Sequence, residues 1–138
     1  MPKPETPLLT VDAIILYEPN KIVLIRRRNP PFKGQYALPG GFVDIGETVE
    51  NACIREAKEE TNIDVKIKEM VGVFSKPDRD PRGHTVTIAY LCVPMTKKEQ
   101  PQAKDDALDL DIIDLNRIDA IKLAFDHRDI IDKAKKLL

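Results

Sequence analysis

Hydrophobic residues along the chain gather in short runs that predict the strands of a sheet. Five such runs, each bounded by polar or turn-forming residues, cover residues 8–17, 22–25, 63–74, 85–93 and 108–115. The first two are joined by a Glu-Pro-Asn-Lys turn, so we expect them to form a hairpin. Both faces of these two runs are largely apolar, which is typical of a sheet covered on both sides in an α/β protein.

Two further segments have the pattern of helices. Residues 48–61 contain no glycine or proline, Thr48 is suited to the N-cap, and Asn62 can end the helix in the left-handed conformation. A second helix is expected to begin at Asp126 and to run into the lysine-rich C-terminal turn. Asp129, three residues after Asp126, would make a weak relative of the capping box.

Segments rich in proline and glycine separate these elements. Residues 29–36 predict an irregular loop, whereas residues 38–43 allow a short strand broken by Gly40 and Gly41, where the backbone can approach a ligand closely. Residues 75–84 are dense in charge and proline, so we expect this loop to have a defined shape without being buried.

Three polar or reactive side chains lie inside apolar segments. Asp12 interrupts the first strand, and it either binds a nearby arginine or lies at a sheet edge facing water. Cys53 and Cys92 lack metal-ligand spacing, so we expect them to be buried free thiols.

Composition narrows the class of protein. The 138 residues suit a single domain, 1–138, that buries enough surface to fold without disulfides or a structural metal. The 22 basic and 23 acidic residues give a net charge of -1, which argues against a nucleic acid as partner. No apolar stretch is long enough to span a membrane and no signal sequence begins the chain, so we expect a cytoplasmic protein.

The helix predicted over residues 48–61 carries acidic residues where a structural helix would be apolar. At 100° per residue, Glu56, Glu59 and Glu60 lie within the arc that Val49 and Ala52 occupy. Clustered carboxylates near an apolar face need a compensating cation, and oxygen ligands favour Mg²⁺ or Mn²⁺ with a phosphate-containing substrate. The alternative is a solvated acidic face paired with neighbouring basic residues.

The segment around this helix resembles the signature of a known enzyme family. Residues 41–63 read GFVDIGETVENACIREAKEETNI and are similar to the Nudix box, GX5EX7REUXEEXGU with U aliphatic. The matching positions are Gly41, Glu47, Arg55, Glu56, Glu59, Glu60 and Ile63. Six fixed positions give a chance match odds on the order of 1 in 100,000. Two positions depart from the pattern: Ala57 is a small aliphatic residue, and Asn62 replaces a glycine but tolerates positive φ.

The resemblance to the Nudix hydrolases implies an α/β/α sandwich with a mixed β-sheet, in which a loop-helix-loop presents metal ions to a substrate diphosphate. By position, Glu56 and Glu60 would be the principal metal ligands, with Glu59 as a further ligand or catalytic carboxylate. A backbone carbonyl at Gly40 or Gly41 would complete the metal shell. The cofactor implied is Mg²⁺ or Mn²⁺, and the reaction is metal-assisted hydrolysis of a diphosphate.

The same resemblance assigns the other catalytic roles. Glu47 and Arg55 would form the ion pair that fixes the loop onto the helix. The family often takes its general base from a loop outside the box. Glu99, Asp105 and Asp106 are candidates, and we favour Asp105 or Asp106 because they directly precede a strand; the alternative is that each is a solvated loop acid.

The loop 75–84 bears on the choice of substrate. Its two prolines set the backbone, and Arg79 and Arg82 suit bidentate contacts with phosphate. His84 ends the loop beside them. The alternative is a rigid surface turn held by internal Asp–Arg pairs. The stretch SKPDRDPRGHTVTIAY resembles the corresponding loop of ADP-ribose pyrophosphatases, and the segments TVDAII, NPPFKGQYALPGGF and LAFDHRDII are also similar to that subgroup.

On this basis the substrate would be ADP-ribose, cut to AMP and ribose 5-phosphate. One of Arg26, Arg27 and Arg28, with Arg28 as our candidate, would contact phosphate, unless this basic run simply faces water. Phe32 or Tyr36 would stack on adenine, unless they pack beneath the loop. The resemblance also suggests a homodimer. Two alternatives stay open: hydrolysis of an oxidised nucleoside triphosphate, and a non-catalytic ADP-ribose sensor.

Overall fold

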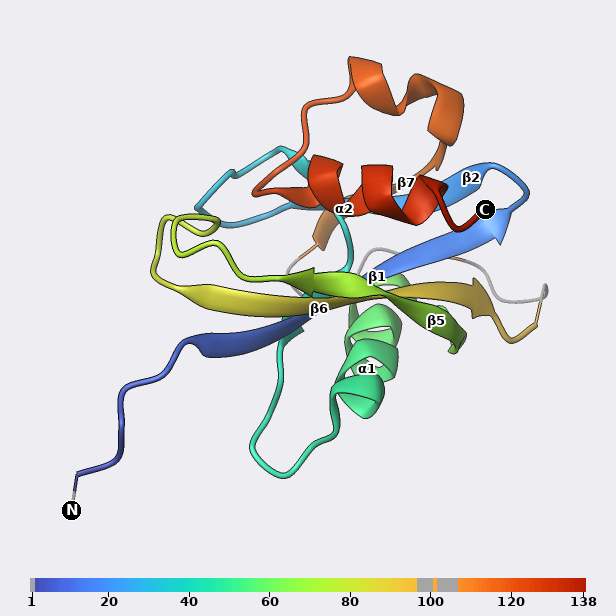
Figure 1. Cartoon of the computed structure of the whole chain (residues 1–138). Coiled ribbons are helices and arrows are strands. Elements are labelled where there is room, and N and C mark those ends of the chain that lie inside the picture. Colours follow the sequence, from blue (N-terminus) through green and yellow to red (C-terminus); the bar gives the residue numbers. More distant parts are fainter. Residues whose placement is uncertain (1, 97–100, 102–106) are drawn as a thin grey trace.

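A mixed β-sheet forms the centre of the structure, a computed structural model that describes residues 2–96, 101 and 107–138 (Figure 1). The strands are β1 (Leu8–Glu18), β2 (Lys21–Arg27), β3 (Tyr36–Ala37), β4 (Gly40–Phe42), β5 (Val65–Phe74), β6 (Thr85–Pro94) and β7 (Ala107–Asp114). The helices are α1 (Val49–Thr61), the 3-10 helix η1 (Leu115–Ala120) and α2 (His127–Lys135).

Strand β1 is the central strand of the sheet. It pairs in parallel with β6 along one edge, and antiparallel with both β4 and β2 along the other. The main path runs β3-β2-β1-β6-β5, with β7 added antiparallel to β2. The predicted hairpin between the first two strands and the predicted mixed sheet are therefore confirmed.

Side chains from both faces of β1 are buried, because helices cover both sides of the sheet (Figure 1). Val11, Ala13 and Ile15 pack into one apolar cluster with residues of α1. Ile14, which points to the opposite face, packs into a second cluster with Ile130 of α2. This arrangement confirms the α/β/α sandwich, and it explains why the strand reads as a continuous apolar run.

Local sequence signals set the ends of α1 as expected. The Thr48 hydroxyl accepts a hydrogen bond from the Asn51 N–H at 3.1 Å, so it caps the helix. Asn62 adopts the left-handed conformation with φ of 64° and donates its N–H to the Lys58 carbonyl. Asparagine therefore supplies the helix stop at the position where the Nudix box usually has glycine.

The start of α2 differs from the prediction. The helix begins at His127, and Asp126 at its N-cap makes no side-chain capping hydrogen bond. Its carboxylate instead accepts two hydrogen bonds from the Arg79 guanidinium, at 2.9 and 2.7 Å. Two charge-assisted bonds to a guanidinium are stronger than one carboxylate bond to a backbone N–H, so the expected capping box does not form.

Two loop predictions also need correction, and one short helix was not predicted. Tyr36 lies in a short strand, β3, and not in the irregular loop. The loop 75–84 is not exposed throughout, because Arg79 and Asp80 at its centre are buried. The 3-10 helix η1 gave no signal in the hydrophobic pattern, since residues 115–120 contain only two buried side chains.

The three unusual side chains within apolar segments are all buried. Asp12 lies in the central strand with its carboxylate 4.0 Å from the Arg79 guanidinium, so of the two alternatives the arginine contact is the one observed. Cys53 and Cys92 are free and buried as predicted, with their sulfur atoms 3.8 Å apart. No helix in the described ranges is both long enough and apolar enough to cross a membrane.

Candidate active site

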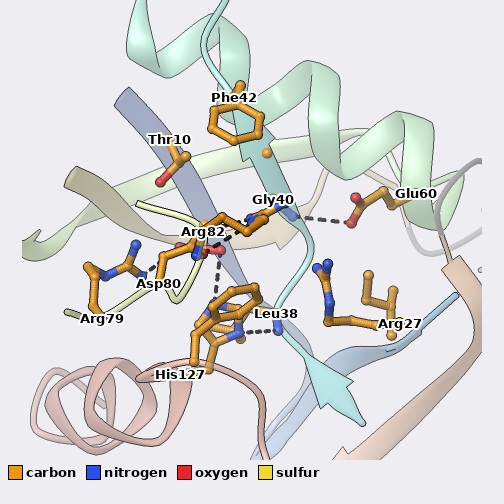
Figure 2. A pocket seen from close by; sticks show the side chains of 14 residues that line it. Thr10, Arg27, Leu38, Gly40, Phe42, Glu60, Arg79, Asp80, Arg82 and His127 are labelled. Carbon is orange, nitrogen blue, oxygen red and sulfur yellow. Dashed lines mark hydrogen bonds and ion pairs between the residues drawn. The ribbon is translucent and has the colours of Figure 1, made fainter. Parts of the chain in front are cut away.

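A cleft lies where β4, the end of β2, the loop 75–84 and α1 meet (Figure 2). Its centre is a cavity of about 220 Å³ whose lining includes Arg27, Gly40, Gly41, Glu56, Glu60 and Arg82. A small cavity of about 70 Å³ continues inward to Asp12 and His127. A larger one of about 610 Å³ continues outward past His84. Phe42 and Arg82 line all three, so the cavities form one continuous site.

The acidic wall of the cleft comes from α1. Glu56 and Glu60 are one helical turn apart and line the same cavity. Glu60 is only 6% exposed, and its carboxylate accepts a hydrogen bond from the Gly40 N–H at 3.2 Å. The predicted placement of acids on the buried face is therefore confirmed for these two residues. The Glu59 side chain, at 44% exposed, lies further out than predicted.

Gly41 lies so close to the Glu56 carboxylate of this wall that only glycine fits at this position in β4. A Cβ atom at this position would lie 2.5 to 2.7 Å from the Glu56 carboxyl atoms. Such an approach is too short for any contact between these atoms, so a side chain would displace the carboxylate. The glycine lets the backbone and a carboxylate share one small space, as the sequence suggested.

Arg55 organises the acids around the box. It donates to Glu47 from two nitrogen atoms, at 2.7 and 2.9 Å, and also contacts Glu56 at 3.0 Å, Glu59 at 3.1 Å and Asp44 at 3.6 Å. The hydrogen bonds with Arg55 lower the pKa of Glu47 to about 2, and the bond with Glu47 raises the pKa of Arg55. One guanidinium thus faces four carboxylates, which leaves an excess of negative charge beside the cleft.

The acidic wall fits a divalent cation bound together with its substrate. In the part of the chain that the structure describes, no three Asp, Glu, His or Cys side chains converge on one point to form a complete protein metal site. Mg²⁺ usually takes only one or two protein carboxylates and fills its remaining positions with water and substrate phosphate. Glu56 and Glu60, which line one cavity, meet that requirement.

The basic wall comes from two segments far apart in the sequence. Arg27 lies at the end of β2, and its Nε donates to the Pro31 carbonyl at 2.7 Å. Arg82 projects from the loop 75–84 and is 46% exposed. Burial alone would raise the pKa of Asp80, but the hydrogen bonds from Arg82 outweigh it and lower that pKa. Figure 2 shows Arg27, Arg82 and Glu60 around the same hollow.

Arg79 occupies a different environment from Arg82, although both belong to one loop. Its side chain is only 4% exposed and pairs with Asp126. It also donates to the Thr85 hydroxyl at 2.7 Å and lies 4.0 Å from Asp12. The guanidinium therefore tethers the loop to β1, β6 and the start of α2.

His127 completes the buried contacts beneath the cleft. Its Nδ1 accepts the Leu38 N–H at 2.9 Å, which places the proton of the neutral ring on Nε2, 3.4 Å from Asp12. Asp12 also accepts a hydrogen bond from the Thr87 hydroxyl at 2.6 Å. Burial lowers the pKa of His127, and its contacts with Asp12 do not reverse that effect.

Of the other predicted substrate residues, only His84 lines one of these three cavities. His84 lines the larger cavity, with its Nε2 3.0 Å from the Ser75 carbonyl. Arg28 is exposed beyond the end of β2.

The two predicted stacking residues contact other parts of the protein. Phe32 packs beside Phe125, with ring centroids 4.8 Å apart. Tyr36 donates its hydroxyl hydrogen bond to Asp111, and this bond raises the Tyr36 pKa. Glu99, Asp105 and Asp106, the candidate bases, lie outside the described residues.

Several residues of the cleft were missed by the sequence reasoning. Phe125 and His127 line the small cavity, and they belong with Asp126 to the segment LAFDHRDII, which the sequence marked only as similar to a subgroup. Their spacing carries no recognisable catalytic pattern. Arg27 was one of three arginines in a row, and the strand period did not indicate which of them turns toward the cleft.

The fold and the carboxylate-lined cleft together define a Nudix domain. The sequence profile of the NUDIX domain family matches residues 6–134, and the chain belongs to this family. The predicted class of enzyme, a Nudix pyrophosphohydrolase, is confirmed. The chain is 51% identical over 125 residues to an ADP-ribose pyrophosphatase of Methanocaldococcus jannaschii, covering 91% of this chain and 71% of that protein.

A second relative is a regulator. The ADPR responsive transcriptional repressor NtrR of Acinetobacter baylyi is 38% identical over 135 residues, but this chain spans only 53% of its length.

Solved structures agree with these relationships. The NUDIX domain of Shewanella oneidensis NrtR complexed with ADP ribose superposes with a TM-score of 0.83 at 29% identity, covering 96% of this chain and 88% of that one. A bifunctional NMN adenylyltransferase/ADP ribose pyrophosphatase from Francisella tularensis, complexed with AMP and a manganese ion, gives 0.81 at 33% identity. The match covers 92% of this chain and 40% of the Francisella chain.

Proposed function

We propose that this chain hydrolyses the diphosphate bond of ADP-ribose, producing AMP and ribose 5-phosphate, with Mg²⁺ or Mn²⁺ as cofactor. The observation that carries the proposal is the cleft itself, with two carboxylates on one wall and two arginines on the other. Similarity to an ADP-ribose pyrophosphatase and to a domain solved with ADP ribose supports this substrate over other diphosphates.

In this proposal the diphosphate lies in the central cavity between the walls. Arg27 and Arg82 contact its oxygen atoms, since guanidinium groups bind phosphate through paired hydrogen bonds. Glu56 and Glu60 hold the cation, and the carbonyl of Gly40 or Gly41 lies close enough to the cavity to add a ligand. Charge on the substrate is then matched from both sides.

The remaining box residues shape this arrangement. Arg55 bonds Glu47, Glu56 and Glu59, which keeps the loop before α1 in place and orients the carboxylates. When bound, the cation neutralises charge that develops on the phosphoryl oxygens and lowers the pKa of the attacking water. Asp105 or Asp106 would accept the proton of that water.

The two ends of ADP-ribose extend from the central cavity. The adjoining cavity of about 610 Å³ is the only one of the three large enough for a nucleoside, and there Phe42 and His84 offer ring surfaces. Phe32 and Tyr36, which pack against the rest of the protein, would contribute through their exposed edges, and Arg28 through its charge. We also propose a homodimer, which light scattering of the purified chain would test.

A second candidate function has one observation in its favour. The similarity to an ADP-ribose-responsive repressor covers 94% of this chain, so binding of ADP-ribose without turnover is the alternative. Both candidates predict binding of ADP-ribose, whereas only the enzyme predicts release of AMP.

A product assay separates these functions. The purified chain is incubated with ADP-ribose, NADH, diadenosine polyphosphates or 8-oxo-dGTP, with Mg²⁺, with Mn²⁺ and with EDTA, and products are resolved by chromatography. We expect AMP from ADP-ribose with either cation and none with EDTA. Binding of ADP-ribose without AMP would support the sensor, and faster turnover of 8-oxo-dGTP would support a triphosphate substrate.

A further inference from the structure

Three consecutive residues at the start of α2 connect the separate walls of the cleft. Asp126 holds the loop 75–84 through its paired bonds with Arg79. His127 accepts the N–H of Leu38, which directly precedes Pro39 and β4. Phe125 lies beside them and lines the small cavity. Asp126 and His127 therefore act through hydrogen bonds within the protein, whereas Phe125 can act only through the contacts of its ring.

The ring of Phe125 lies against both arginines of the basic wall. The guanidinium carbon of Arg27 is 4.9 Å from its centroid, and that of Arg82 is 5.7 Å away. Both distances fall within the range of a cation–π interaction. Phe32 also packs against this ring, edge to face, with the ring centroids 4.8 Å apart.

The backbone at Phe125 adopts an uncommon conformation for a bulky residue. Its φ is 53°, in the left-handed region that is unfavourable for a residue with a Cβ atom. Such conformations persist where the surrounding structure fixes them, and they cluster at functional sites. Here the conformation belongs to a ring that contacts both arginines.

Two arginines facing one cavity are oriented more precisely when a further group contacts both of them. Their positive charges repel one another, and each long side chain has many rotamers to lose on binding a ligand. The negative face of an aromatic ring attracts guanidinium groups and leaves their N–H groups able to donate. Arg82 also donates to Asp80 from two nitrogen atoms, at 3.1 and 2.8 Å, and its guanidinium carbon lies 5.7 Å from the centroid of the Phe42 ring. Arg27 donates its Nε to the Pro31 carbonyl. The Phe125 ring is therefore an additional contact, and it is the one that the two guanidinium groups share.

We propose that Phe125 is a positioning residue that holds Arg27 and Arg82 in the orientation that receives the substrate diphosphate. This inference rests on the proposed function, because it takes the two arginines to be diphosphate ligands. It predicts that the ring acts on substrate affinity and has little influence on the chemical step.

The test compares Phe125→Leu, which keeps an apolar side chain but removes the ring face, with Phe125→Tyr, which keeps the ring. For Phe125→Leu we expect the KM for ADP-ribose to rise about tenfold while kcat changes less than about twofold. Phe125→Tyr should retain the wild-type KM. The matched control is Phe74→Leu. This substitution also removes a ring that contacts a cation, because the Lys133 ammonium of α2 lies 5.6 Å from the Phe74 ring, but neither residue lines the cleft. This control should leave KM unchanged.

A double-mutant cycle separates positioning from general packing. If Phe125 acts through Arg82, then Phe125→Leu and Arg82→Ala together should raise KM by clearly less than the product of their separate effects. An unchanged KM in Phe125→Leu, a failure of Phe125→Tyr to retain the wild-type value, or multiplicative effects in the cycle would each overturn the proposal.

Binding of inorganic pyrophosphate tests the inference independently of catalysis. Calorimetric titration of the wild type and of Phe125→Leu, without divalent cation, reports the arginine wall alone. We expect the Phe125→Leu Kd to be about tenfold higher. If ADP-ribose is not hydrolysed but this difference is found, the proposed function fails and the positioning role stands. Equal Kd values would overturn the positioning role even in an active enzyme.

Discussion

Two groups of charged side chains adjoin the cleft, and each is built around one arginine. They differ in their exposure to solvent and in how much negative charge the arginine leaves uncompensated. The box cluster consists of Arg55 with Asp44, Glu47, Glu56 and Glu59, and it is partly exposed. The buried cluster consists of Arg79 and His127 with Asp12, Asp126, Thr85 and Thr87. In the box cluster one guanidinium serves four acids. In the buried cluster the bidentate Arg79–Asp126 pair leaves much less charge uncompensated.

The difference shows how the same chemical groups serve binding in one place and shape in another. A partly solvated group with excess negative charge attracts a cation, and an arginine within it orders the acids without neutralising them. A buried group must be matched internally, because an unpaired charge there costs several kcal/mol. We therefore propose that the side of the cleft near the box cluster binds the cation and that the buried cluster maintains the shape of the cleft.

The largest expected effect comes from breaking the buried cluster. Arg79→Met removes the guanidinium but keeps an extended side chain, which leaves Asp126 and the buried Asp12 without their cation. We expect the free energy of unfolding to fall by about 3 to 5 kcal/mol in urea titrations. The control Lys21→Met breaks an exposed pair with Glu18 and should cost less than about 1 kcal/mol. Equal losses in both variants would contradict the distinction between the clusters.

The second effect is on catalysis at the acidic wall. Glu60→Gln removes a negative charge but keeps a carbonyl that can accept the Gly40 N–H. We expect kcat for ADP-ribose to fall about 10²- to 10³-fold with little change in unfolding free energy. Glu69→Gln, at an exposed position of β5, is the control and should leave kcat unchanged. Wild-type activity in Glu60→Gln would remove Glu60 from the proposed metal ligands.

The two clusters also differ in how far they could be predicted from the sequence. The ends of α1 depend on Thr48 and Asn62, and the positions of Glu56 and Glu60 depend on helical spacing, so these features are local and were predicted. The pair between Arg79 and Asp126 joins residues 47 positions apart. It depends on how β1, β6 and α2 pack, which no local pattern encodes, and a capping role for Asp126 was predicted instead.

A third prediction compares the two arginines of the loop 75–84. Arg82→Ala removes a half-exposed guanidinium that lines the cleft and pairs with Asp80 of its own loop, whereas Arg79 is buried and joins the loop to other elements. We expect Arg82→Ala to raise the KM for ADP-ribose about three- to tenfold and to raise that for a nucleoside triphosphate less. The variant also removes the partner of the buried Asp80 carboxylate, so the free energy of unfolding should fall by about 1 to 3 kcal/mol, less than in Arg79→Met. Equal KM changes for both substrates would mean that this loop does not determine substrate choice.

The smallest expected effect is a difference in the pH ranges over which the clusters stabilise the fold. Burial lowers the pKa of His127 from its ordinary 6.5, so the unfolded chain binds the proton more readily and stability falls as the pH drops below about 6.5. The pKa of Glu47 is lowered from 4.5 to about 2, so its contribution is complete above pH 4.5 and is lost only between about 4.5 and 2. The buried cluster should therefore weaken first on acidification.

Urea unfolding of wild type, His127→Asn and Glu47→Gln at a series of pH values measures this order. Asparagine can still accept the Leu38 N–H but does not titrate, so His127→Asn should lose less stability than wild type between pH 7 and 5. Glu47→Gln should follow the wild-type slope in that range and depart from it only below pH 4.5. NMR titration of the His127 ring gives the same information without a substitution. A ring that protonates above pH 6.5 in the folded chain would show that the nearby carboxylates, and not burial, dominate the buried cluster.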